Sequence, residues 1–154
     1  MITYIIIGIT VLVSYLCFNN AELFRKLALI PYRTVKNNEW YRLITHGFVH
    51  ADMTHLLVNM FTFWSFGTYI EKVFGYLGFG TWGFLGLYFG GMIFASIYDL
   101  VKHHNDPYYV SIGASGAVSA ILFSYILFDP WSKILLFAII PVPGIIFGVV
   151  YLAY

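Results

Sequence analysis

Charged residues are scarce in this chain: only 10% of its 154 residues are Asp, Glu, Lys or Arg, and 60% are hydrophobic. Soluble domains carry about 25% charged residues, so water is not the main solvent of this protein. The net charge of +1 forms no basic or acidic surface, and we expect no nucleic-acid partner. The single cysteine, Cys17, cannot form an intramolecular disulfide and is interpreted as a small buried apolar residue.

Apolar runs without charge are abundant. A bilayer core is about 30 Å thick and takes about 20 helical residues to cross. Five runs approach this length: Ile2–Phe18, Met53–Ile70, Phe74–Tyr98, Ile112–Phe128 and Ile134–Tyr154. Since no alternating pattern indicates strands and unpaired backbone groups are costly in lipid, the sequence predicts an all-α, polytopic transmembrane helical bundle. The first run has neither a basic start nor a small-residue cleavage site and is predicted to be a retained span.

Two segments depart from this pattern. The connection from Asn19 to Asp52 holds five of the eight Lys and Arg residues together with aromatic side chains, so we expect it to fold and to lie partly in the membrane interface. By the positive-inside rule its charge would place it in the cytoplasm. The run Pro141-Val142-Pro143-Gly144 should end or sharply kink a helix. About a dozen residues follow, roughly 18 Å of helix, so we expect one domain, 1–154, that ends inside its fifth helix.

Polar side chains within apolar spans are candidates for function. His55 and Asn59 are four residues apart and share one face of a predicted helix, although interhelical hydrogen bonds would also explain them. Ser115 opens a later apolar run, where helix N–H groups can stabilise an anion, although small residues at helix contacts are also common there. His103 and His104 lie in a polar connection and are interpreted as solvated. Taken together, a serine nucleophile with nearby oxyanion donors indicates acyl transfer.

The segment Glu39–Gly75, EWYRLITHGFVHADMTHLLVNMFTFWSFGTYIEKVFG, resembles the first connection and second helix of rhomboid intramembrane serine proteases. It contains a W-x-R pair, an H-x-x-x-x-H-x-x-x-N core and a closing G-x-x-x-E, and the downstream GASGA resembles the family's nucleophile motif. The resemblance covers about Ile2 to Tyr154 and implies five helices of a six-helix rhomboid-like core, with the first connection as a membrane-embedded hairpin.

The resemblance also implies roles for individual residues. Ser115 would be the nucleophile, and His55 and Asn59 would stabilise the oxyanion. Supporting residues would be Gly113, Ala114, Gly116 and His50, and structural residues that hold the first connection would be Trp40, Arg42 and Glu71. The implied activity is that of a serine endopeptidase cleaving transmembrane segments of membrane proteins near the membrane surface. The implied location is a bacterial inner membrane with the first connection outside, opposite to the charge bias.

The family's general base is a histidine on a sixth helix, and no histidine of this sequence matches that position. Without a base a serine hydroxyl is a weak nucleophile, so we expect this chain alone to be inactive as a protease. The first explanation is truncation. The second is a natural pseudoprotease or membrane-protein chaperone that binds clients without cutting them. The third is a substitute base, His103 or His104.

A hypothesis from a different functional class is a metal or haem site whose ligands would be His46, His50, His55 and Asp52. No cysteine ligand supports it, and the resemblance explains the same histidines, so we expect neither metal nor cofactor. The expected partners are the lipid bilayer and transmembrane protein substrates.

Overall fold

The computed structural model describes residues 1–136 and 139–153 and is mostly helical. Its elements are α1 (Ile2–Phe18), α2 (Ala21–Leu27), α3 (Pro31–Lys36), α4 (Arg42–Thr45), the 3₁₀ helix η1 (His46–Phe48), α5 (Met53–Tyr76), α6 (Gly80–His103), α7 (Ser115–Phe128), β1 (Lys133–Leu136), β2 (Ile140–Pro143) and α8 (Gly144–Ala153). The predicted all-α helical bundle is confirmed, apart from one short hairpin of strands.

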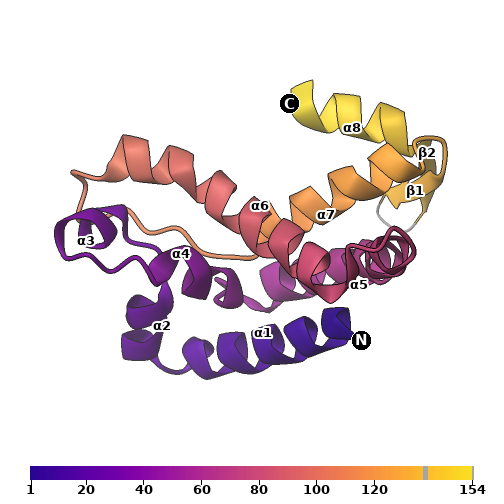
Figure 1. Ribbon diagram of the computed structural model, residues 1–154. Helices are drawn as coiled ribbons and strands as arrows, with labels where there is room; N and C mark the ends of the chain where they lie inside the picture. The colour runs from indigo at the N-terminus through magenta and orange to yellow at the C-terminus, as the bar shows by residue number, and fades with distance from the viewer. Residues whose placement is uncertain (137–138, 154) are drawn as a thin grey trace.

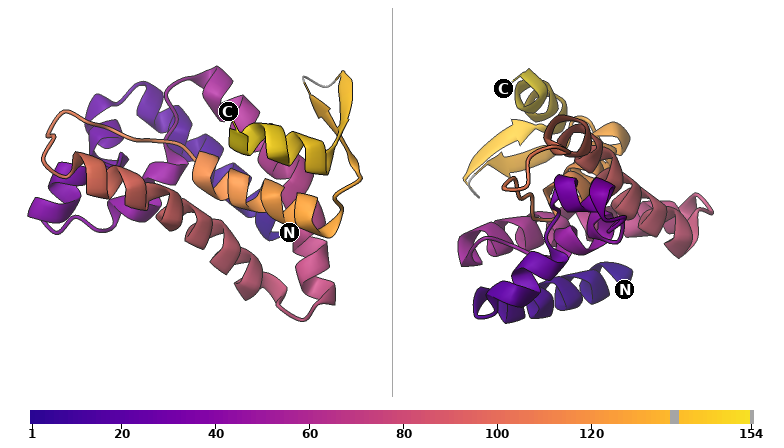
Figure 2. Two further views of the ribbon diagram at one scale, coloured as in Figure 1. Left: turned by 90° about the horizontal axis from the view of Figure 1, so that it is seen from above. Right: turned by 90° about the vertical axis from the view of Figure 1, so that its left-hand side faces the viewer.

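The core lies where α1, α5, α6 and α7 meet. Phe63 of α5 and the α6 residues Phe84 and Tyr88 are fully buried there, and their aromatic rings are 4.9 to 6.2 Å apart between centroids. α7 packs between α5 and α6, and α8 lies over α7 on the side away from α1 (Figures 1 and 2). This arrangement brings the start of α7 against the middle of α6 and the start of α5.

The crossing of α6 and α7 depends on two glycines. A Cβ placed on Gly91 would lie 2.4 Å from the Cβ of Ala120, and one placed on Gly116 would lie 2.4 Å from the Cβ of Ala95. Small residues at membrane helix contacts let two backbones approach closely. Gly91 and Gly116 therefore fix how near Ser115 lies to α6.

The connection between α1 and α5 is folded, as predicted, and its short helices gather at one end of the molecule (Figure 1). It is tied to the segment after α6 by paired backbone hydrogen bonds between Leu29 and Ser111, at 2.9 and 3.0 Å. The connection and the segment that leads to Ser115 thus form one structural unit.

The predicted helix over Ile134–Tyr154 is wrong in its first part. β1 and β2 form an antiparallel pair in which Leu135 faces Pro141. Proline is tolerated in edge strands, where its missing N–H faces away from the partner, and the flanking Ile and Val residues favour extended structure. The expected break at Pro143-Gly144 is where α8 begins.

Within the described residues, α6 alone is both long and apolar enough to cross a membrane. The apolar helices α1, α7 and α8 are shorter, with 17, 14 and 10 residues. α5 has 24 residues but carries His55, Asn59, Glu71 and Lys72, so its mean hydropathy is lower. These helix lengths fit a bundle whose helices differ in how far they reach through the bilayer.

Candidate active site

Ser115 is the first residue of α7 and is exposed. Its N-cap, Ala114, has no side chain that could cap the helix. The first N–H groups of a helix have no carbonyl partner within the helix and carry its positive dipole end. The Ser115 hydroxyl therefore lies beside backbone donors that could bind an anion.

Gly113 shapes the turn before the serine. Its φ is +105°, a conformation that side chains strongly disfavour. A Cβ placed there would lie 2.9 Å from Cε1 and 3.0 Å from Nε2 of His55. The backbone N–H of Gly113 donates to the carbonyl of His46 at 3.0 Å. Glycine is thus required both by the backbone conformation and by the close approach of the imidazole.

His55 and Asn59 lie on the first turns of α5. The Asp52 carboxylate caps this helix, accepting from the His55 backbone N–H at 2.8 Å. The Asn59 amide donates to the His55 carbonyl at 3.0 Å, and Asn59 is 8% exposed. The structure brings His55 against Gly113, two residues before Ser115, with Asn59 one turn deeper on α5.

His50 lies behind this pair and is fully buried. Its ring meets that of His55 edge-on, with centroids 4.9 Å apart, and its Nε2 lies 3.5 Å from the backbone nitrogen of Ala114. Burial, together with a smaller effect of the nearby His55, lowers the pKa of His50 to about 4, and Asp52 partly opposes this shift. His50 is therefore neutral at physiological pH.

A small cavity of about 110 Å³ borders Ser115 on the α6 side. His46 lines it together with Ser96 and Asp99 of α6. The Nδ1 of His46 is 2.8 Å from the Arg42 carbonyl, and Nε2 is 3.3 Å from the Ser96 hydroxyl. Burial lowers the pKa of His46. The sequence did not single out Ser96 and Asp99, although both are polar residues in an apolar helix, which is the signal that could have found them.

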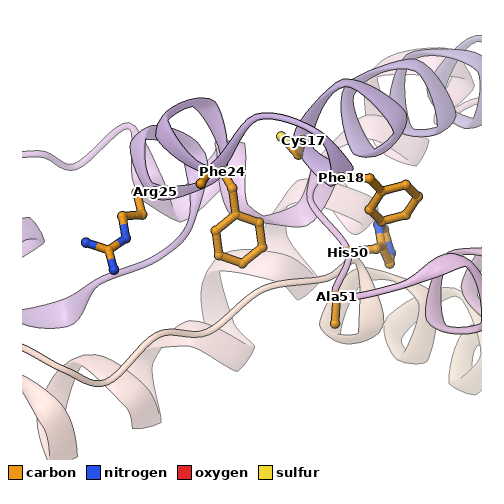
Figure 3. Close-up of a pocket in the computed structure, with 7 residues that line it drawn as sticks. Cys17, Phe18, Phe24, Arg25, His50 and Ala51 are labelled. Atoms are coloured by element: carbon orange, nitrogen blue, oxygen red, sulfur yellow. The ribbon is translucent and has the colours of Figure 1, made fainter.

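A larger cavity of about 380 Å³ lies on the other side of His50, between the end of α1, α2 and the loop before α5. Figure 3 shows the Phe24 ring pointing into this space, with Phe18 and His50 at one end and Arg25 at the other. Cys17, Ala21 and Ala51 complete its lining. His50 thus separates this cavity from the turn that carries Ser115.

Arg42 holds the first connection together from within. Its guanidinium is fully buried and donates to the carbonyls of Arg25 and Ala28 at 2.8 and 2.5 Å, and to the carboxylate of Glu39 at 2.5 Å. Glu39, which the sequence reading did not assign, also pairs with Arg33 at 2.9 Å. Burial would raise the pKa of Glu39, but the two arginines outweigh it and lower the pKa. Trp40, expected to be structural, is half exposed.

Glu71 lies elsewhere than expected. Its carboxylate accepts from the backbone N–H groups of Ile2 and Thr3, at 2.8 and 3.2 Å, and from the Thr3 hydroxyl at 2.7 Å. It also pairs with the amino group of Met1. Glu71 therefore caps α1 from near the far end of α5, rather than holding the first connection, because α1 and α5 run side by side.

The substitute base proposed from His103 or His104 is not supported by the geometry. His103 stacks on Tyr109 with ring centroids 3.6 Å apart, and His104 bonds to the Val101 carbonyl. His103 is eight residues beyond Ala95, which contacts Gly116, and this distance is about 12 Å along a helix. Neither His103 nor His104 lines the small cavity beside Ser115.

The alternative metal site is not supported either. Within residues 1–136 and 139–153, no three His, Cys, Asp or Glu side chains are grouped as ligands. The Nδ1 atoms of His46 and His50 lie within hydrogen-bond distance of the Arg42 carbonyl and the Ser14 hydroxyl.

Residues 37–154 match the family model described as the Rhomboid domain. The chain is 30% identical to RHOMBOID-like protein 12, mitochondrial, of Arabidopsis thaliana over 154 residues, covering 90% of this chain and 44% of that protein. It is 37% identical to the putative rhomboid protease YdcA of Bacillus subtilis over 92 residues, covering 60% and 43% of the two chains. It is 31% identical to the rhomboid protease GluP of the same species over 125 residues, which cover 78% of this chain and 23% of that protein.

The chain belongs to the rhomboid family. It spans less than half the length of each of these three relatives. The family consists of integral membrane proteins that are generally serine proteases, and rhomboid proteases act on transmembrane substrates within the membrane.

Proposed function

We propose that this protein is an intramembrane serine endopeptidase in which residues 1–154 form a single rhomboid-like membrane domain and Ser115 is the nucleophile. The observation that carries the proposal is the exposed Ser115 at the start of α7, with His55 packed against Gly113 at the same turn. A serine at a helix start, with backbone N–H donors and a histidine at the same turn, supplies the nucleophile and the oxyanion donors of acyl transfer.

In the proposed reaction the Ser115 Oγ forms a bond to the scissile carbonyl carbon while its proton passes to a general base, a histidine that the family resemblance assigns to a sixth helix and that is not among the five histidines of this sequence. The negative charge that develops on the carbonyl oxygen would be stabilised by the His55 ring, the Asn59 amide and the Ser115 backbone N–H. Collapse of this intermediate breaks the C–N bond, and the leaving amine takes up the proton. Water then attacks the acyl-enzyme, releasing the new carboxylate and regenerating the serine.

We further propose that the substrates are transmembrane segments cut near the membrane surface. The position of Ser115 supports this, since the serine opens an apolar helix and follows a polar segment tied to the first connection. We place the protein in a bacterial plasma membrane, which the two Bacillus relatives support. A mitochondrial membrane is the competing location, which the mitochondrial relative from Arabidopsis supports, and membrane fractionation of the source organism distinguishes the two.

The test is cleavage of a model transmembrane substrate in proteoliposomes by the full gene product. Ser115→Ala should abolish cleavage and labelling by a serine-reactive fluorophosphonate. Ser119→Ala, one turn further along α7, is the matched control and should retain both activities. His55→Ala and Asn59→Ala should each lower kcat by about ten- to a thousand-fold. Unchanged cleavage in Ser115→Ala would disprove the assignment.

A non-catalytic rhomboid-like pseudoprotease or membrane-protein chaperone is the second candidate. The observation that favours it is that none of the five histidines, all of which lie in the described residues, hydrogen-bonds to Ser115. This function predicts that wild type and Ser115→Ala protect a client membrane protein from degradation equally well, and that neither cuts it.

A further inference from the structure

Ser14 is a polar residue of α1 that the proposed function does not use. It is fully buried, and its Oγ lies 2.8 Å from the carbonyl oxygen of Phe48 and 2.9 Å from Nδ1 of His50. A serine hydroxyl has a single proton, and a carbonyl oxygen can only accept. The hydroxyl therefore donates to Phe48, and His50 must be the donor in its bond to Ser14.

The second nitrogen of His50 leads to the same tautomer. Nε2 lies 3.5 Å from the backbone nitrogen of Ala114, which can only donate. Nε2 must then carry the lone pair, which agrees with a proton on Nδ1. The low pKa of His50 keeps the ring neutral, so it has one donor and one acceptor. The opposite tautomer would place two N–H groups against each other at Ala114.

The contacts of His50 connect α1 to the reacting serine. Ala114 is the N-cap of α7 and precedes Ser115, and the His55 ring approaches both the His50 ring and Gly113. A change in the orientation of the His50 ring would therefore alter two contacts of this turn, its own contact with the Ala114 nitrogen and the contact of His55 with Gly113. Groups that orient a working histidine typically contribute ten- to a hundred-fold in activity, as is known for the partners of metal-bound histidines.

We propose that Ser14 is a positioning residue that fixes the Nδ1–H tautomer of His50 and thereby holds the backbone turn that carries Ser115. Its effect on catalysis rests on the proposed protease function. Its effect on the tautomer does not, and can be measured whether or not the protein cleaves substrates.

The direct test is ¹⁵N NMR of histidine-labelled protein in detergent micelles at pH 7. In the wild type, the His50 Nδ1 resonance should lie in the range of a protonated nitrogen and Nε2 in that of an unprotonated one. In Ser14→Ala the two resonances should move toward each other as the tautomers mix, and Ser14→Thr, which keeps the hydroxyl, should restore the separation. Wild-type protein with the proton on Nε2, or an unchanged spectrum in Ser14→Ala, would overturn the proposal.

Thr10→Ala is the matched control. Thr10 is also fully buried on α1, one turn from Ser14, and its hydroxyl donates to the Ile6 carbonyl of its own helix at 2.7 Å. It should leave the His50 spectrum unchanged. A shift in Thr10→Ala as large as that in Ser14→Ala would mean that any loosening of α1 is sufficient, and would contradict a specific role for Ser14.

The kinetic test uses the full gene product. Ser14→Ala should lower kcat by about ten-fold with little change in KM, and Ser14→Thr should recover most of the loss. An equal loss in Ser14→Ala and Ser14→Thr would overturn the positioning role. If the wild-type gene product does not cleave the substrate, or if Ser115→Ala cleaves it as well as the wild type, the proposed function fails while the NMR result still decides the role of Ser14.

Discussion

At the scale of single residues, Gly113 is the position where the backbone and the site constrain each other most tightly. Its positive φ and its contact with His55 both exclude a side chain. We expect Gly113→Ala to lower protein stability by about 1–3 kcal/mol and to reduce cleavage by more than ten-fold. Gly86→Ala is the control, because Gly86 has open space where its Cβ would lie. Thermal unfolding and proteoliposome assays of both variants test this, and equal behaviour of the two would contradict it.

His50 predicts a pH dependence of stability. Its pKa is lowered to about 4 in the folded protein by burial and by His55, with Asp52 opposing. The unfolded chain therefore binds a proton near pH 6.5 that the folded protein does not yet accept. Stability should be constant above pH 6.5 and fall as the pH drops toward 4, by at most about 3 kcal/mol from this residue.

Unfolding in mixed detergent micelles between pH 7 and 4 measures this dependence. His46, whose pKa is also lowered, contributes in the same direction, so the wild type is compared with His50→Gln. In His50→Gln the free energy of unfolding should depend less steeply on pH, because only the contribution of His46 remains. Identical slopes in the two proteins would show that His50 does not titrate as described.

The residue scale also shows what sequence reasoning finds and what it misses. His55, Gly113 and Ser115 could be proposed because each belongs to a short motif whose residues lie within ten positions of one another. Ser14 and Ser96 could not, since the histidines they contact lie 36 and 50 positions away in the chain. Glu71 was found but given the wrong contacts, because its partners in α1 lie about 70 residues before it.

At the scale of elements, the crossing of α6 and α7 places the serine. Gly90 and Gly91 are neighbours, but only a Cβ on Gly91 would meet α7. Gly91→Ala should force the helices apart, destabilise the protein by about 1–3 kcal/mol and reduce activity. Gly90→Ala should be neutral or slightly stabilising, since alanine is the better helix former. Unfolding of the two variants in micelles checks this, and an equal loss in both would argue against a tight crossing.

The element that sequence reasoning described least well is the last one. A continuous apolar run over Ile134–Tyr154 is compatible with a buried helix or with strands, and periodicity alone does not separate them. Pro141 and Pro143 were correctly interpreted as a break, yet the residues before them form a hairpin. The helix that follows begins where the break predicted.

At the scale of the whole molecule, the Leu29–Ser111 pairing puts the first connection and the segment after α6 on the same side of the membrane. The turn between α5 and α6 lies at the other end of α6. In a Cys17→Ala background, cysteines at Lys36 and Tyr108 should react with a membrane-impermeant thiol reagent from one side, and a cysteine at Tyr76 only from the other. All three positions are exposed.

Labelling of intact cells and of inverted vesicles also decides the orientation. The family resemblance implies that Lys36 and Tyr108 react from outside, whereas the excess of Lys and Arg in the first connection implies the cytoplasm. Reaction of Lys36 and Tyr108 positions from opposite sides would contradict the fold itself.

The shortness of α7 has a consequence for the lipid around the protein. Its 14 residues reach about 21 Å, whereas a typical hydrocarbon layer is about 30 Å thick. α7 ends at Phe128, and the polar residues Asp129, Ser132 and Lys133 follow, so we expect this end to lie at the polar boundary. If α7 runs along the membrane normal, Ser115 lies about 9 Å below the opposite boundary of the hydrocarbon layer. The length of α7 is fixed, so this depth changes with the thickness of the hydrocarbon layer. Shorter acyl chains should bring the serine closer to water and longer chains should submerge it, so lipid chain length itself becomes a determinant of access to the nucleophile.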